Sequence, residues 1–213
     1  TPGSRAIVLG DTGAWTTLSG EIPAYMDSDG LLRYFPADRL RGSEALTAYA
    51  LSMTAEAGWA VPEDARQKML QAMKSVVDGR LTREYSWGGD ARLLRISALA
   101  ALARNGASTP AMLASISLAP ADMPTSALTD WIVAIDRTRG ANTALRETAE
   151  RTLRQRIVYE GSRLDLADAS NAPWWMMSSG DEMSIKALIA VLGRPGWSDE
   201  GPKMMVGTAL RQR

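Results

Sequence analysis

The stretch from Gly30 to Gly79 has the pattern of two amphipathic helices joined by a tight turn, and it constrains the fold more than any other part of the chain. Ser43 is a suitable N-cap for the first helix, Gly58 a suitable end, and Pro62 a suitable first residue for the second helix. The predicted apolar stripes are Leu46, Tyr49, Ala50, Met53 and Ala57, then Ala65, Met69, Ala72, Met73 and Val76. Because each helix has one apolar face, the pair needs further helices to cover it.

The rest of the chain continues this helical pattern between glycines and prolines. One or two short helices are expected within the first 25 residues. Further helices are predicted over Asp90–Asn105, from Thr109 to near Leu118, from Thr125 or Ser126 to Gly140, over Thr143–Tyr159, from a cap at Asp181 to Gly193, and from near Pro202 onward. No stretch has the two-residue alternation of a convincing strand, and the segment from Gly161 to Asn171 is predicted as a loop.

The predicted helices fall into two kinds. Those over 90–105 and 181–192 are apolar nearly all round and should be buried on most sides. The helix over 143–159 has a charged outer face, with Glu147 and Arg151, and Glu150 and Arg154, at the i,i+4 spacing of ion pairs. This alternation predicts an all-α fold, an incomplete α/α toroid of paired inner and outer helices forming one domain over 1–213. An α-solenoid would show a strict repeat length, which the sequence lacks.

Composition excludes several classes of function. Among 213 residues, 24 basic and 24 acidic side chains cancel without a block of like charge, so no nucleic-acid partner is expected. The chain has no Cys and no His. Their absence excludes thiol nucleophiles, Ser-His-Asp triads, and metal sites that use thiolate or imidazole ligands. No cofactor or metal is expected. No apolar run approaches the ~20 residues of a membrane span, and neither a span nor a signal peptide is expected in this chain.

Three motifs have both a functional and a structural interpretation. The cluster Trp174, Trp175, Met176 and Met177 could stack on a ligand, but packing is the favoured prediction. The run Ser178, Ser179, Gly180 and Asp181, with Lys186 as the nearest base, is interpreted as a loop and a helix cap. The run Asp27, Ser28, Asp29 and Gly30 resembles the start of a calcium loop, but Leu31 replaces the third oxygen ligand, which favours an Asp/Gly turn.

Paired carboxylates keep one enzymatic alternative open. They occur at Asp165 and Asp168, at Asp181 and Glu182, and at Asp199 and Glu200. Helical toroids can host glycosidases that use two carboxylates, so an α/α-toroid glycosidase is the alternative enzyme hypothesis. The main expectation is that the chain is not an enzyme and contains no catalytic residue.

Several separated motifs together resemble the thioester domain of bacterial alpha-2-macroglobulins, over nearly the whole chain. They are Asp29-Gly30-Leu31-Leu32 with Tyr34-Phe35-Pro36, Gly42-Ser43, Leu46-Thr47-Ala48-Tyr49, Glu56-Ala57-Gly58-Trp59, Pro124-Thr125-Ser126-Ala127 with Asp130-Trp131, Trp174-Trp175-Met176, and Ala209-Leu210-Arg211-Gln212. The thioester domain of that family is itself an α/α toroid.

The resemblance implies a broad-spectrum endopeptidase inhibitor that traps proteases in the periplasm and takes part in host defence. Its partners would be target proteases and other domains of a parent lipoprotein anchored at the inner membrane. In the family, a protease cuts a bait region, and a Cys-x-Glu-Gln thioester is released to acylate it. Ser4-Arg5-Ala6 resembles the residues after that motif, so the thioester is expected just before Thr1. No thioester residue is expected within this chain. The domain would shield and present the thioester, or serve as a docking scaffold.

A second alternative is that the chain is a helical interaction module. In this interpretation it would dock a cell-wall synthase that makes peptidoglycan, as some relatives are thought to do. Such a module would bind its partner without any protease being present.

Overall fold

The computed structural model of the chain describes residues 12–83, 90–160 and 163–211. Its larger helices are α2 (Thr12–Gly20), α3 (Glu44–Ala57), α4 (Glu63–Val77), α5 (Ala91–Arg104), α6 (Pro110–Ala114), α7 (Thr125–Arg137), α8 (Thr143–Gln155), α9 (Gly180–Val191) and α10 (Glu200–Arg211). Single 3-10 turns are η1 (Ile22–Tyr25), η2 (Pro120–Asp122), η3 (Ala169–Asn171), η4 (Trp174–Met176) and η5 (Pro195–Trp197). The expected short helices near the start correspond to α2 and η1.

The predicted hairpin of α3 and α4 is confirmed together with its capping residues. The Ser43 side chain accepts a hydrogen bond from the Leu46 N–H at 3.2 Å, which satisfies a donor that has no partner inside the helix. Gly58 ends α3 with φ 66°, a left-handed conformation that glycine adopts without a Cβ clash. Pro62 was predicted as the first residue of α4 but occupies its N-cap, so α4 begins one residue later than predicted, at Glu63.

The apolar stripe predicted for α4 is buried throughout, whereas the stripe predicted for α3 is wrong. Tyr49 and Ala50 are only half-buried and Ala57 is exposed. The buried face of α3 is instead Ala45, Thr47, Ala48, Leu51, Ser52 and Thr54. The small side chains on this face pack toward α5, whereas the prediction relied on the larger apolar residues beside them.

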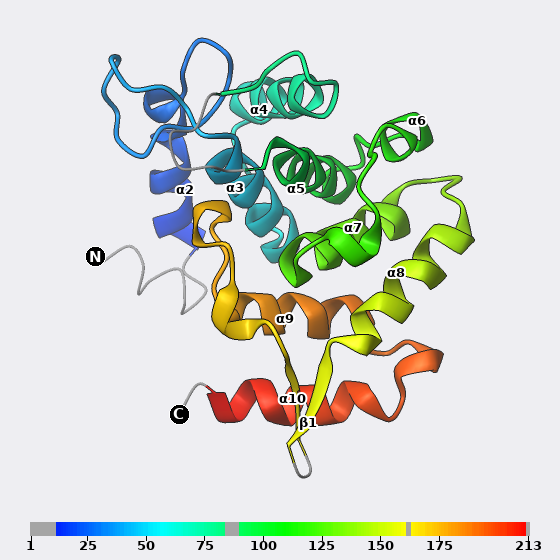
Figure 1. The fold of residues 1–213 in the computed structure, drawn as a ribbon. Helices are drawn as coiled ribbons and strands as arrows, with labels where there is room; N and C mark the ends of the chain where they lie inside the picture. Colours follow the sequence, from blue (N-terminus) through cyan, green and yellow to red (C-terminus); the bar gives the residue numbers. More distant parts are fainter. Residues whose placement is uncertain (1–11, 84–89, 161–162, 212–213) are drawn as a thin grey trace.

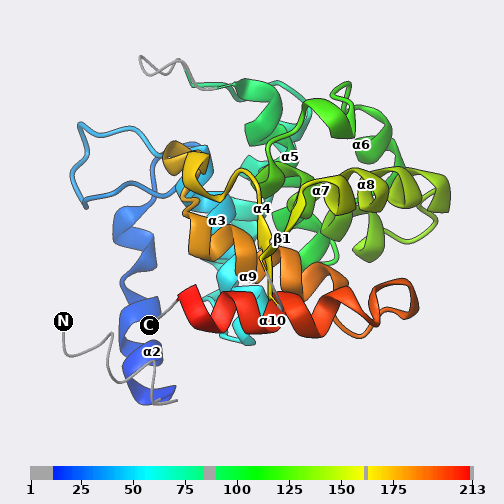
Figure 2. The same ribbon diagram turned by 60° about the horizontal axis from the view of Figure 1, so that its bottom comes forward.

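The helices alternate between an inner arc and an outer layer. In the inner arc, α3 contacts α5, α5 contacts α7, and α7 contacts α9. In the outer layer, α4 packs against α3 and α5, α8 packs against α7, and α10 packs against α9. Figures 1 and 2 show this arrangement from α3 to α10. Nine residues of α5 and eleven of α7 are buried, as expected for inner helices. The prediction of an all-α fold with inner and outer helices is therefore confirmed.

A small β-hairpin replaces the end of one predicted helix. Strands β1 (Ile157–Glu160) and β2 (Arg163–Leu166) pair antiparallel, with Ile157 opposite Leu166. The helix predicted to reach Tyr159 ends at Gln155, and the stretch predicted as a loop from 161 to 171 contains β2, so both predictions were wrong there. In β2, Leu164 and Leu166 are buried and Asp165 between them is not, which is the two-residue period of a half-buried strand.

The hairpin is covered by α10, which packs closely against β2. A Cβ added at Gly207 of α10 would lie 2.1 Å from the carbonyl oxygen of Leu164. Only a residue without a side chain allows helix and strand backbones to approach this closely. Sequence periodicity alone cannot show such a contact, because Gly207 and Leu164 are far apart in the chain.

Some helix boundaries and charge pairs also differ from the prediction. The N-cap of α9 is Ser179 rather than Asp181, since the Ser179 Oγ accepts from the Glu182 N–H at 3.1 Å. Glu150 pairs with Arg146, and Arg154 pairs with Glu200 of α10, so the predicted pairing of Glu150 with Arg154 is not formed. Among the described residues, no helix has both the length and the apolar character required to cross a membrane.

Candidate functional site

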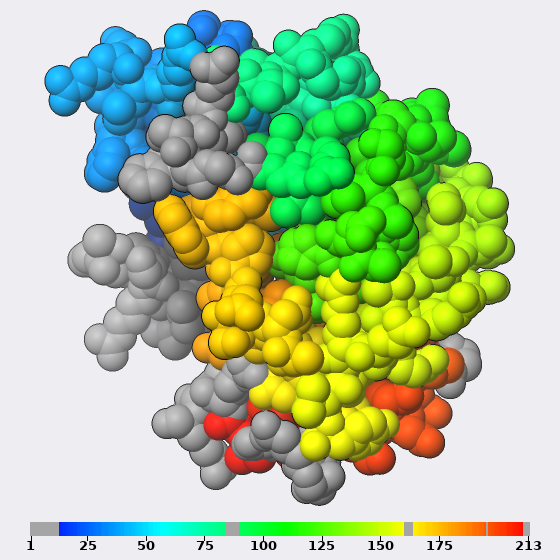
Figure 3. Space-filling model, in the orientation of Figure 1, coloured from blue at the N-terminus to red at the C-terminus, as the bar shows by residue number. Residues whose placement is uncertain are grey.

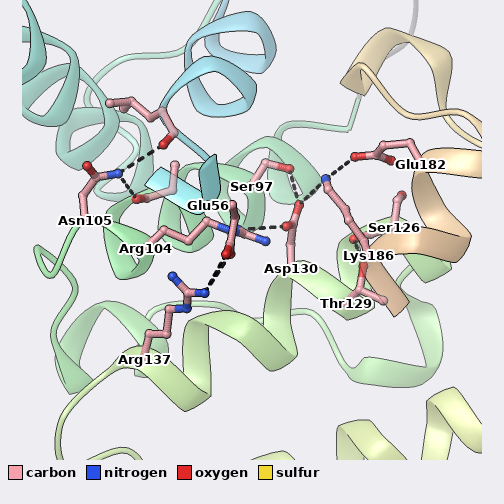
Figure 4. Close-up of polar contacts among 12 residues, drawn as sticks. Glu56, Ser97, Arg104, Asn105, Ser126, Thr129, Asp130, Arg137, Glu182 and Lys186 are labelled. Atoms are coloured by element: carbon pink, nitrogen blue, oxygen red, sulfur yellow. Dashed lines mark hydrogen bonds and ion pairs between the residues drawn. The ribbon is translucent and has the colours of Figure 1, made fainter. Parts of the chain in front are cut away.

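The four inner helices bring six charged side chains together near the centre of the arc, in a group named here the axial network. Its members are Glu56 of α3, Arg104 of α5, Asp130 and Arg137 of α7, and Glu182 and Lys186 of α9. Figure 4 shows these side chains pointing toward one another from separate helices. Three acids and three bases alternate along the network, so its formal charges cancel.

Lys186 and Asp130 form the inner end of the axial network. The Lys186 Nζ lies 2.6 Å from the Glu182 Oε1 and 3.6 Å from the Asp130 Oδ2. Asp130 is buried, and it also accepts a hydrogen bond from the Ser97 Oγ at 3.4 Å. Glu182 and Lys186 stand four residues apart on α9, the spacing that places two side chains on one helix face.

The outer half of the axial network runs from the interior to the surface. Arg104 donates from its Nη1 to the Asp130 Oδ1 at 3.2 Å and from its Nε to the Glu56 Oε1 at 2.9 Å. The Arg137 Nη2 then donates to both carboxylate oxygens of Glu56, at 2.8 and 2.9 Å. Side-chain exposure rises from 4% at Arg104 to 39% at Arg137. Only the outermost pair is therefore well screened by solvent.

The environment of Lys186 keeps its amine protonated. Burial by itself would lower the pKa of Lys186, but the charges of Asp130 and Glu182 outweigh burial and raise that pKa above its ordinary value. A lysine with a raised pKa is a poor proton acceptor at neutral pH. Ser178, the nearby candidate nucleophile, donates instead to the Glu182 Oε2 at 2.8 Å. This geometry supports cross-linking of helices rather than proton transfer.

A small polar cavity adjoins the axial network. Ser52, Ser97, Ser126 and Ser178 line it together with Asp130 and Lys186. Its volume of about 10 Å³ matches a single water molecule and leaves no room for a sugar ring. The buried Ser126 Oγ has no hydrogen-bond partner among the described residues. Within the described ranges, no group of three or more Asp and Glu residues is arranged to hold a metal ion.

The carboxylates singled out in the sequence have separate partners in the fold. Asp168 caps α7, because its two oxygens accept from the Thr125 N–H at 3.1 Å and from the Thr125 Oγ1 at 2.8 Å. Glu200 pairs with Arg154 at 3.0 Å. Asp165 and Asp199 lie in β2 and beside α10, and Asp181 lies in the first turn of α9. Of the six residues, only Glu182 joins the axial network, where Lys186 holds it.

The aromatic and aspartate motifs have mixed outcomes. Met176 is buried and Trp175 packs against the core, which confirms the packing prediction for these two residues. Trp174 is 69% exposed, so that prediction was wrong for it. The Asp/Gly turn is confirmed, because the Gly30 N–H donates to the Asp27 carbonyl oxygen at 3.1 Å and Gly30 has φ 86°.

A single aspartate organises the loop around this turn. The Asp27 carboxylate accepts from the N–H groups of Asp29, Leu31 and Gly42, at 2.9, 2.9 and 2.8 Å, and from the Arg83 Nη2 at 2.8 Å. Burial by itself would raise the pKa of Asp27, but these hydrogen bonds and the Arg83 charge together lower it. The Asp27 oxygens are thus used to fix the backbone of the loop.

Separate sequence motifs contain Glu56, Asp130, Glu182 and Lys186, but no motif indicates that these residues form one network, and none contains Arg104 or Arg137. Arg104, Asp130 and Lys186 lie far apart in the chain and form no short motif. One signal was available: Asp130 is the single charged residue between Thr125 and Ile135, in a helix that is buried almost throughout. A lone charge on a buried helix requires a partner from another element.

Comparison with solved structures relates the fold to known proteins. No protein-family model and no curated protein matches the chain. A crystal structure of native alpha-2-macroglobulin from Escherichia coli, spanning domain MG7 to the C-terminus, matches 99% of the chain with a TM-score of 0.69 and 16% identity. A crystal structure of trypsin activated alpha-2-macroglobulin from the same organism matches 91% of the chain with a TM-score of 0.68 and 16% identity.

The chain spans 33% and 13% of those two proteins. It therefore corresponds in fold to one part of a much larger molecule. Residues 1–11, with Ser4-Arg5-Ala6 and the expected thioester position before Thr1, lie outside the described residues. The resemblance to a region of bacterial alpha-2-macroglobulin, expected from the sequence motifs, is confirmed at the level of the fold.

Proposed function

We propose that this chain is the helical thioester-domain part of a bacterial alpha-2-macroglobulin and serves in protease inhibition rather than in catalysis. The observation that carries the proposal is the match in fold over 99% of the chain to a native alpha-2-macroglobulin. The second neighbour is described as trypsin activated, which supports a protease as the partner. The protein would act in the periplasm, where the parent chain meets incoming endopeptidases.

The axial network is consistent with a scaffold role. Its charged groups are committed to one another, and the small polar cavity beside Asp130 and Lys186 has room for about one water molecule. A domain that presents a thioester must stay closed to water until the parent chain is cleaved, since the activated acyl group hydrolyses on exposure. Helices cross-linked through their centre suit that requirement.

Methylamine treatment of the native full-length parent protein tests the thioester part of the proposal. Methylamine opens an internal thioester and stays attached to the acyl group. Intact-mass spectrometry should show one added methylamine, and prior treatment should abolish any covalent adduct with trypsin on a denaturing gel. An unchanged mass in a folded parent protein would contradict the presence of a thioester. The docking-scaffold role would then be the remaining proposal for the domain.

A trapping assay tests inhibition separately. Trypsin incubated with the parent protein should lose activity toward casein while keeping activity toward a small chromogenic peptide, because a caged protease stays accessible only to small substrates. Equal activity toward both substrates, with and without the parent protein, would contradict protease trapping whatever the methylamine result.

A further inference from the structure

A projecting loop over residues 33–41, named here the aromatic loop, exposes side chains that a folded chain usually buries. Tyr34 is 52% exposed and Phe35 is 67% exposed. Figure 3 shows the loop (light blue) extending from one corner of the molecule. Tyr, Trp, Phe and Arg are the residue types enriched in protein interfaces, and exposed aromatic residues on a fixed loop mark an interaction surface.

The aromatic loop is held in one shape. The Arg33 N–H donates to the Tyr25 carbonyl oxygen at 2.7 Å, and the Leu40 N–H donates to that of Ala37 at 2.9 Å. Asp27 fixes the loop base through the Gly42 N–H. On one flank, the Tyr34 Oη lies 4.0 Å from the Met177 Sδ, which places the loop beside η4. A preorganised loop loses little conformational entropy on binding, so its exposed side chains can contribute to affinity.

The charge beside the aromatic loop is positive. Arg33, Arg39, Arg41 and Arg83 line a polar pocket with three aspartates, Asp27, Asp29 and Asp38. Each aspartate is already paired, because Arg83 contacts Asp27 and Asp29 while Arg33 contacts Asp38. Arg39 and Arg41 are exposed and make no hydrogen bond or ion pair within the part of the chain that the structure describes. These two guanidinium groups remain available for an acidic partner.

We propose that the aromatic loop is a docking surface for an acidic protein segment, in which an apolar side chain flanked by carboxylates contacts Tyr34 and Phe35 while the carboxylates pair with Arg39 and Arg41. A protein partner fits better than an anionic membrane. Lipid-binding patches use about four to eight basic residues, whereas this loop offers two unpaired arginines and carries the fully exposed Asp38 between the aromatic residues and these arginines. The inference does not depend on a thioester or on protease trapping.

Calorimetric titration of the chain with a synthetic peptide, Ac-GEEDLFDEEG-amide, tests the proposal. A dissociation constant of about 10–100 µM is expected at an ionic strength near 0.03 M, weakening as salt shortens the Debye length. The double variant Arg39→Glu/Arg41→Glu should weaken binding at least ~10-fold, and Phe35→Ala by roughly 5-fold. The matched control Arg139→Glu/Arg151→Glu makes the same charge change at exposed positions elsewhere and should leave the constant unchanged.

Three outcomes would overturn the proposal. The first is no peptide binding at millimolar concentration, and the second is equal binding by both double variants. The third is that the chain binds phosphatidylglycerol vesicles but not the peptide, and that Arg39→Glu/Arg41→Glu abolishes the vesicle binding. This result would assign the loop to a membrane surface. Circular dichroism of every variant checks that the fold is retained.

Discussion

The axial network and the loop base around Asp27 use charge in different ways. In the axial network, every partner is a side chain, and the contacts join four helices that would form without them. At Asp27, three of the four partners are backbone N–H groups of an irregular loop, whose own backbone pairing consists of isolated bridges. The first arrangement fixes how complete helices pack against one another. The second takes the place of secondary structure, since it satisfies donors that a helix or sheet would otherwise pair.

Asp130→Ala should produce the largest loss of stability. It removes the shared partner of Lys186 and Arg104 and leaves two buried cations with fewer compensating charges. Breaking a buried pair in this way costs about 4 kcal/mol of the free energy of unfolding. Urea denaturation of the chain measures the loss.

The control for Asp130→Ala is Glu63→Ala, which breaks an exposed ion pair with Arg66 on α4. Solvent screens that pair, so the free energy of unfolding should fall far less than in Asp130→Ala. Similar losses in the two variants would show that the axial network does not stabilise the fold through burial.

Asp27→Asn should have a smaller but clear effect. An amide has one acceptor oxygen in place of two, so if that oxygen keeps the Asp29 and Leu31 N–H groups, the Gly42 N–H and Arg83 both lose the acceptor that they share. We expect a loss of about 2 kcal/mol, the usual size for hydrogen bonds to a charged group. Hydrogen exchange should locate it, with faster exchange at the Gly42 amide and unchanged exchange in α5. Uniformly faster exchange would contradict a local role for Asp27.

The contribution of Asp27 should also depend on pH. Because the folded-state pKa lies below the ordinary value of 3.8, the unfolded chain binds a proton more readily as pH falls. The stability supplied by Asp27 is then present above about pH 4 and is lost as pH falls through the lower folded-state pKa. The difference in unfolding free energy between wild type and Asp27→Asn, measured from neutral to acidic pH, should be constant and then shrink. A difference that grows below pH 4 would contradict the assigned direction of the shift.

Ser43→Ala should have the smallest of these effects. Ser43 follows the loop base and caps α3 through the Leu46 N–H. Loss of an N-cap costs about 1 kcal/mol. The change in urea midpoint should be reversed in part by Ser43→Asp, since an aspartate can also cap and is favoured at a helix N-terminus. Failure of Ser43→Asp to recover any stability would contradict the capping role.

Local signals in the sequence were enough to predict most of the fold. Ser43, Gly58 and Gly79 act through their immediate neighbours, so their positions indicated where helices begin and end. The β-hairpin was missed because Ile157 continues the four-residue spacing of Leu145, Ala149 and Leu153, and nothing local marks the exchange of helix for strand. The axial network was missed for a related reason. Charges on four helices become partners only once the helices are packed together.

The close contact between Gly207 and Leu164 gives the outer helix α10 a mechanical link to the centre of the molecule. From Leu164 the chain runs through β2 to Asp168, whose carboxylate holds the first residue of α7. The same helix carries Asp130 about one and a half turns further on. A displacement of α10 would therefore pull on α7 through a short and nearly inextensible strand. Gly207→Ala, although remote from every charged group of the axial network, would act on it through this tether.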